Sequence, residues 1–205
     1  MKLCTSAPLR LCVKRDGLAG LVLAGGQGTR FGGPKAWATL PDGRSFLEAC
    51  KEALRGAGAV PVVATLPPES TDPKIGDLIA LPLPESGLDM FASIRFGLQR
   101  LIDFEGWMRV AILPVDHPLV ASAAIAAVAA ADVQAAVPCY RGKHGHPVVI
   151  DRSDAEAIAD GRRPGPTLRE VLRACGAVDV AVDDPGTTAN CNTPEDLARH
   201  LEEIV

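Results

Sequence analysis

Short apolar runs alternate with helical segments along almost the whole chain, and this alternation limits the folds that the chain can adopt. Runs typical of buried strands cover residues 18–24, 60–65, 109–113, 134–140, 147–150 and 178–182. Helices are predicted over 46–55, 89–101, 122–131 and 167–176, and a last helix starts at Pro194. Because strands that alternate with helices favour a parallel sheet covered on both faces, we expect an α/β fold. It would be a three-layer α/β/α domain with a mostly parallel sheet over residues 18–205.

Capping residues mark where several of these helices begin. Ser45 is followed three positions later by Glu48, and Thr167 by Glu170, which is the spacing of a capping box. Thr193 precedes Pro194, the residue type that favours the first turn of a helix. The predicted helices therefore have defined amino-terminal ends.

Residues 1–17 precede the first strand and read as an amino-terminal extension. Pro8 and Arg10 interrupt its apolar residues, which argues against a secretory signal, and no run in the chain is long enough to span a membrane. The six cysteines form no C-x-x-C pair and are too sparse for a disulfide framework. These features favour reduced cysteines, a cytoplasmic location and no membrane partner.

The charge balance argues against a nucleic-acid partner. The chain has 21 Lys and Arg against 25 Asp and Glu, a formal net charge of −4, whereas proteins that bind nucleic acid without sequence preference are usually basic. Aromatic residues are only 4% of the chain, so few side chains are available to stack on bases.

A glycine-rich loop follows the first predicted strand. Five glycines lie between residues 25 and 33, and two cations lie close by, Arg30 and Lys35. Glycine lets a backbone approach an anion closely and present several N–H donors, so the loop favours a triphosphate. It matches neither familiar phosphate loop: Phe31 stands where a dinucleotide fingerprint needs its third glycine, and Lys35 is followed by Ala36 rather than Ser or Thr. A surface loop that merely turns is the alternative.

The segment 23–35 resembles the signature loop of nucleotidyltransferases with the GT-A-like, Rossmann-related fold. This resemblance implies that the loop wraps the triphosphate of a nucleoside triphosphate, with Arg30 and Lys35 on phosphate oxygens. The expected nucleotide-binding residues of the loop are Leu23, Ala24, Gly25, Gly26, Gln27, Gly28, Thr29, Arg30 and Lys35.

Further segments resemble the MobA-like branch of that family, which contains the molybdenum cofactor cytidylyl- and guanylyltransferases. Segment 87–98, with Gly87 and Ser93, is similar to a segment that lies near the nucleotide. Segment 113–120 resembles the motif whose aspartate, here Asp116, binds the catalytic magnesium. An acidic residue just past a buried strand also suits a cation on physical grounds, although a plain turn residue would fit the same spacing.

Two more segments bear on the metal and the acceptor. Segment 190–197 resembles the closing motif that supplies a second metal contact, from Asn190 or Asn192; Asn-x-Asn is closer to the guanylyl branch, while the cytidylyl branch usually has Asp-x-Asp. His146, in Gly-His-Pro, is expected on the acceptor side by resemblance. His117 would either contact substrate phosphate there or cap a helix.

The resemblance implies a Mg²⁺-dependent transfer of a nucleoside monophosphate from CTP or GTP to a phosphate acceptor, with release of pyrophosphate. Arg30, Lys35 and Asp116 would be the catalytic residues, and molybdopterin the acceptor. A molybdoenzyme or its chaperone is a possible protein partner. The alternatives are a sugar-phosphate or other phospho-alcohol nucleotidyltransferase, and a delivery protein that binds nucleotide or molybdenum cofactor without catalysis.

A zinc site is a further alternative. His144 and His146 lie two residues apart, and His117 and Cys139 could join them. Gly142 and Gly145 predict that the histidine segment is a turn, which weighs against a shared strand face.

Overall fold

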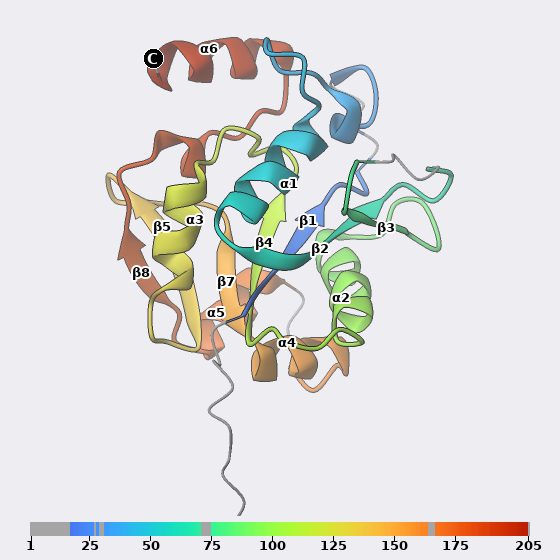
Figure 1. The fold of residues 1–205 in the computed structure, drawn as a ribbon, viewed down its shortest axis with the longest axis vertical. Helices are drawn as coiled ribbons and strands as arrows, with labels where there is room; N and C mark the ends of the chain where they lie inside the picture. The colour runs from blue at the N-terminus through green and yellow to red at the C-terminus, as the bar shows by residue number, and fades with distance from the viewer. Residues whose placement is uncertain (1–16, 27, 29–30, 71–74, 164–166, 205) are drawn as a thin grey trace, which may run out of the picture.

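The fold is built on an eight-stranded sheet (Figure 1). The computed structural model describes residues 17–26, 28, 31–70, 75–163 and 167–204. The strands are β1 (Leu18–Leu23), β2 (Ala59–Leu66), β3 (Ile79–Pro82), β4 (Arg109–Pro114), β5 (Ala135–Tyr140), β6 (Lys143–His144), β7 (Val148–Asp151) and β8 (Val178–Ala181). The helices are α1 (Phe46–Gly56), α2 (Met90–Leu101), α3 (Ser122–Ala129), α4 (Arg152–Ala159), α5 (Leu168–Ala174) and α6 (Pro194–Ile204), with short 3₁₀ helices η2 (Lys35–Trp37) and η3 (Pro185–Thr188).

The strand order is β3-β2-β1-β4-β7-β5-β6, with β8 on the other side of β5 from β7. β1 pairs in parallel with β2 and β4, and β2 with β3. β7 runs antiparallel to both β4 and β5, and β8 is parallel to β5. The prediction of a mostly parallel sheet is confirmed. The carboxyl ends of β1, β4, β5 and β8 therefore meet at one edge, where β7 begins.

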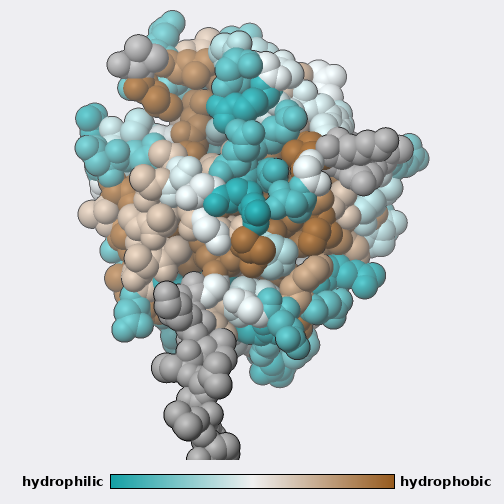
Figure 2. Space-filling view, viewed as in Figure 1, coloured by the Kyte–Doolittle hydropathy of each residue, from teal (hydrophilic) through white to brown (hydrophobic). Residues whose placement is uncertain are grey.

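Helices cover both faces of the sheet, so the predicted three layers are also confirmed. Side chains alternate between two cores along each strand: Leu21 packs in one and Val22 in the other. α1 and α3 lie side by side on the Val22 face, and α2, α4 and α5 cover the Leu21 face (Figure 1). In Figure 2, hydrophilic residues form a band over the outer side of α1, opposite its apolar face.

The predicted helix caps form as hydrogen bonds. The Glu48 N–H donates to Ser45 Oγ at 3.2 Å, and the Ser45 N–H donates to the Glu48 carboxylate at 2.7 Å. Thr193 Oγ1 accepts from the Asp196 N–H at 3.1 Å, at the start of α6. α6 lies at the end of the molecule toward which β1 and β4 point (Figure 1). None of the described helices has the length and hydropathy needed to cross a membrane.

Apart from the two 3₁₀ helices, three elements were absent from the sequence prediction. α4 follows β7 directly, because Asp151 is both the last residue of the strand and the helix cap that accepts from the Asp154 N–H. β3 is a short strand at the edge of the sheet that ends in Pro82, and β6 turns part of the predicted histidine turn into a two-residue strand. The predicted extension lies outside the described residues except for Gly17, whose carbonyl accepts from the Met108 N–H.

Candidate active site

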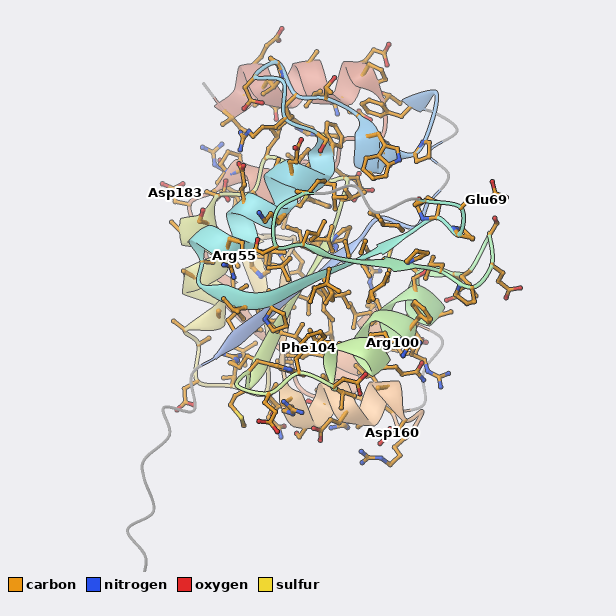
Figure 3. The ribbon with its side chains drawn as sticks, turned by 45° about the vertical axis from the view of Figure 1, so that its right-hand side comes forward. Arg55, Glu69, Arg100, Phe104, Asp160 and Asp183 are labelled. Atoms are coloured by element: carbon orange, nitrogen blue, oxygen red, sulfur yellow. The ribbon has the colours of Figure 1, made fainter. Side chains whose placement is uncertain are left out.

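A pocket of about 360 Å³ opens at the carboxyl ends of β1 and β4, the edge where α/β sheets bind their ligands. The glycine loop, the start of α2 and the segment before α6 complete its walls. Eight residues that the sequence predicted for the site line this pocket: Leu23, Gly25, Gly26, Gly28, Lys35, Ser93, Asp116 and Asn192. Glu69, in the loop after β2, and Asp183, two residues after the end of β8, lie on opposite sides of the molecule in Figure 3.

Lys35 forms hydrogen bonds with two other polar side chains at the centre of this pocket. Its Nζ lies 3.1 Å from Asp116 Oδ2 and 2.6 Å from Asn192 Oδ1. The side chains of Lys35 and Asp116 are only 16% and 22% exposed, so solvent screens their attraction less than that of a surface pair. Three predicted site residues, up to 157 positions apart in the sequence, thus meet at one point.

Backbone hydrogen bonds fix the segments that carry these side chains. The Val115 N–H donates to the Leu23 carbonyl at 3.1 Å, which extends the β1–β4 pairing beyond the end of β4. The Cys191 N–H donates to the Asp116 carbonyl at 2.8 Å, which places Asn192 beside Asp116. The geometry of the centre therefore follows from the sheet edge and not from flexible side chains alone.

The described part of the glycine loop turns tightly at one glycine and is open at another. Gly28 has φ +58°, and a Cβ there would lie 2.0 Å from the Gly33 carbonyl oxygen. Gly26 is exposed and lines the pocket, and no described atom lies within 4 Å of where its Cβ would be. The backbone at Gly26 can therefore be approached closely by a ligand. Gln27, Thr29 and Arg30, which were also predicted to bind nucleotide, lie outside the described residues.

Of the two residues predicted from segment 87–98, one lines the pocket. Ser93 is 7% exposed, and its hydroxyl donates to the Asp89 carbonyl at 3.1 Å. Gly87 is exposed, with φ +80°, and is not a lining residue; its neighbours Leu88 and Met90 are. Neither residue was predicted from the sequence, because apolar residues near a helix start are usual in any α/β domain.

The two predicted acceptor-side histidines contact each other. The ring centroids of His117 and His146 lie 4.8 Å apart with 57° between their planes. The Nδ1 atom of each is buried and has no hydrogen-bond partner in the described part of the chain. Burial lowers the pKa of His117. Burial and the nearby His117 ring together lower the pKa of His146 to about 4. Both rings are therefore neutral at pH 7.

A second cavity, of about 780 Å³, shares one lining residue with the first. Met90 lines both, and His146 lines the second together with Arg169 and Arg173. The two arginines are four residues apart on α5 and so share a helix face, a spacing visible in the sequence but not used there. This cavity therefore combines cationic side chains with a predicted acceptor residue.

The predicted metal residues separate into two groups. Asp116 and Asn192 meet at the Lys35 ammonium group, whereas Asn190 is exposed and outside the pocket. Of the two asparagines left open by the motif, the structure thus brings Asn192 to the centre.

Comparisons with known proteins identify the family. The family model described as "MobA-like NTP transferase domain" matches residues 20–180. A curated relative from Rhodobacter capsulatus, named molybdenum cofactor guanylyltransferase, is 34% identical, over 91% of this chain and 96% of its own. A relative of the same name from Xanthomonas euvesicatoria pv. vesicatoria is 28% identical, over 90% of this chain and 94% of its own.

Solved structures support the fold. The crystal structure of Rv0371c from Mycobacterium tuberculosis H37Rv superposes with a TM-score of 0.74 at 23% identity, covering 92% of this chain and 100% of that one. A second structure of that protein, in complex with manganese, has a TM-score of 0.67 at 24% identity over the same shares of the two chains. Nucleotidyltransferases typically use a divalent metal ion. With a family match over most of its length, the chain belongs to the MobA-like NTP transferases and is a nucleotidyltransferase.

Proposed function

We propose that this enzyme transfers GMP from GTP to the terminal phosphate of molybdopterin, with Mg²⁺ as its metal ion and pyrophosphate as the leaving group. The observation that carries the proposal is the convergence of Lys35, Asp116 and Asn192 beside the open backbone of Gly26. The two relatives named guanylyltransferase support GTP over CTP, and so does the Asn-x-Asn motif that ends at Asn192.

The donor set at this centre fits magnesium. Asp116 Oδ2 and Asn192 Oδ1 already converge on a cation, the Lys35 ammonium group, and both are hard oxygen donors of the kind that Mg²⁺ prefers. We therefore assign Asp116 and Asn192 as the residues that hold the metal. A bound Mg²⁺ would withdraw charge from the α-phosphate and so favour attack at phosphorus.

The protein residues mainly position the reactants and neutralise charge. Backbone N–H groups of Gly25, Gly26 and Gly28 would donate to the triphosphate, and Lys35 would move from the two oxygens to the β- and γ-phosphates. A phosphate oxygen of the acceptor then bonds to the α-phosphorus as the bond to the β-phosphate oxygen breaks. Lys35 would stabilise the negative charge that develops on the departing pyrophosphate. Arg30 is proposed for the same role by resemblance alone.

We place the acceptor in the second cavity. Arg169 and Arg173 line this cavity and offer the charge-assisted donors that a phosphate-bearing acceptor needs. His146 also lines it, and its ring contacts the ring of His117. Met90 lines both cavities, so an acceptor in the second would lie next to a nucleotide in the first. Residues 18–205 would form one nucleotidyltransferase domain, and a molybdoenzyme or its chaperone would receive the product.

The test is product formation with a panel of nucleotides. The full chain is incubated with molybdopterin, Mg²⁺ and each of GTP, CTP, UTP and ATP, and pyrophosphate and the dinucleotide product are quantified. We expect GTP to give the highest kcat/KM, and EDTA to abolish the reaction. A preference for CTP would refute the base assignment, transfer to a sugar phosphate would refute the acceptor, and nucleotide binding without pyrophosphate release would indicate a delivery protein.

The asparagine motif offers a matched pair of variants for the metal assignment. Asn192→Ala removes an oxygen from the centre, whereas Asn190→Ala changes an exposed residue outside the pocket. We expect Asn192→Ala to raise the Mg²⁺ concentration needed for half-maximal rate at least about tenfold, because even the loss of a residue that only orients a ligand costs about 10- to 100-fold in metal affinity. Equal effects of the two substitutions would contradict the assignment.

A further inference from the structure

β5, β6 and β8 bring a thiol, an imidazole and a carboxylate together at one end of the sheet. Cys139 on β5 is the cross-strand partner of His144 on β6. Asp179 on β8 is the partner of Val137, which lies two residues before Cys139 and therefore on the same face of β5. The register of three strands thus places Cys139, His144 and Asp179 on one face.

The donor atoms of these residues are close enough to share one ion. His144 Nε2 lies 3.0 Å from Asp179 Oδ2, and donor atoms of all three residues lie within 4.8 Å of one another. Around a tetrahedral zinc ion with bonds of about 2.0–2.3 Å, donors are about 3.3–3.5 Å apart. The side chains of His144 and Asp179 are 64% and 55% exposed. They are therefore free to rotate by the small amount that brings the donor atoms from within 4.8 Å of one another to the spacing around a bound ion.

We propose that Cys139, His144 and Asp179 form a binding site for a transition-metal cation of the Zn²⁺ type. Sulfur and nitrogen donors favour such an ion over Mg²⁺, which prefers oxygen, so this site is chemically distinct from the oxygen pair of Asp116 and Asn192. Three protein ligands leave one tetrahedral position for water or a substrate atom. The thiol binds as thiolate, so binding releases its proton to the solvent.

This site differs from the zinc cluster that the sequence suggested. Cys139 and His144 remain, but His117 and His146 contact each other instead. Asp179, from a strand far along the chain, supplies the third ligand. The expected turn around His144 is wrong in one respect: β6 gives His144 a defined strand partner, and that pairing makes the shared face possible.

An ion here would tie the β5–β6 hairpin to β8 next to the second cavity. His144 and Asp179 both line that cavity, and Gly145 and His146 follow His144 directly. Occupancy would therefore stabilise the segment that carries His146. The metal site itself does not depend on the proposed function, since its ligands and its test involve neither nucleotide nor acceptor.

The test is titration of the metal-free full chain with Co²⁺ alone, followed by competition with Zn²⁺. We expect one Co²⁺ per chain that gives a thiolate-to-cobalt charge-transfer band and tetrahedral d–d bands and that is displaced by Zn²⁺. Cys139→Ser should remove the charge-transfer band, and His144→Gln and Asp179→Asn should each weaken binding at least about tenfold. Both of the latter residues are exposed, so these two variants are expected to fold, which circular dichroism without metal checks.

Controls separate this cluster from other ligands in the chain. Cys175→Ser changes another half-buried thiol, and His200→Gln changes an imidazole on α6 that contacts Glu203. Cys4 and Cys12 lie outside the described residues, so a Cys4→Ser/Cys12→Ser variant is included. All three controls should bind Co²⁺ as the parent does. Absence of the band, its survival in Cys139→Ser, or its loss in the Cys4/Cys12 variant would overturn the proposal.

Discussion

Adding a single methyl group at Gly26 separates nucleotide binding from folding. The Cβ of Gly26→Ala would have no described atom within 4 Å, and the backbone there lies outside the positive-φ region. The folded protein therefore accommodates the methyl group without a clash. Because alanine also restricts the unfolded chain, we expect the free energy of unfolding to stay the same or rise by up to about 1 kcal/mol.

The bound nucleotide meets that methyl group directly if the triphosphate lies on this loop. A phosphate oxygen that accepts from a backbone N–H lies about 2.7–2.9 Å from the nitrogen, whereas a methyl carbon needs about 3.5–4.0 Å from its neighbours. The added methyl at Gly26 would thus displace the phosphate and break at least one charge-assisted hydrogen bond. Such a bond contributes about 1.5–3 kcal/mol, which corresponds to a rise in Kd of roughly 10- to 150-fold.

Isothermal titration calorimetry with GTP and Mg²⁺ measures this Kd without any acceptor, and urea unfolding measures stability. The matched control is Gly33→Ala in the same loop, where a Cβ also has no described neighbour within 4 Å but which does not line the pocket. We expect its Kd to stay within about twofold of the parent, a difference below 0.5 kcal/mol. If Gly26→Ala bound GTP as tightly as the parent, the triphosphate would not lie against this backbone, and the loop assignment would be wrong.

Three other variants test the centre and its surroundings. Lys35→Ala should lower kcat about 100- to 1,000-fold, because it removes a cation from the leaving phosphates. Lys51→Ala breaks the ion pair between Lys51 on α1 and Asp77 in the loop before β3, and it should leave the rate unchanged. Equal rates for the two variants would exclude a phosphate role for Lys35. Gly28→Ala should cost about 2–4 kcal/mol of stability, read from urea midpoints, because its Cβ would meet the Gly33 carbonyl and its φ is positive; an unchanged midpoint would contradict the turn. Burial raises the pKa of the Cys191 thiol to about 12, whereas the thiol of the unfolded chain has a pKa near 8.5. The free energy of unfolding is therefore unaffected below about pH 8.5 and falls above it, by about 2 kcal/mol between pH 8 and pH 10. Cys191→Ala should lack that part of the pH dependence, and an identical loss in both proteins would refute it.

The elements that the sequence predicted well are those with local signals. The Ser45–Glu48 box and the Thr193 cap involve residues at most three apart, so their hydrogen bonds can be anticipated from spacing. α4 was missed because Asp151 ends a strand and caps a helix with no glycine or proline between them. β6 was missed because two residues carry no periodicity, and only pairing with β5 defines it.

The candidate site shows a similar division. Lys35 and Asp116 were identified from motifs, but spacing could not choose between Asn190 and Asn192. That choice depends on the Cys191 N–H, which bonds to the Asp116 carbonyl and brings Asn192 to Lys35. Asp179 could not be anticipated as a ligand at all, because its neighbour Cys139 is reached only through the pairing of β8 with β5.

By itself, the sequence determined the α/β class and the resemblance to nucleotidyltransferases, and it predicted a phosphate-binding role for the glycine loop. These depend on residue type, periodicity and short spacings, which are properties of neighbours along the chain. Only the tertiary structure decided which side chains meet: Lys35 with Asn192, His117 with His146, and Cys139 with Asp179. The physical reason is that strand order and register set these contacts, and both are fixed by burying two apolar faces across the whole sheet.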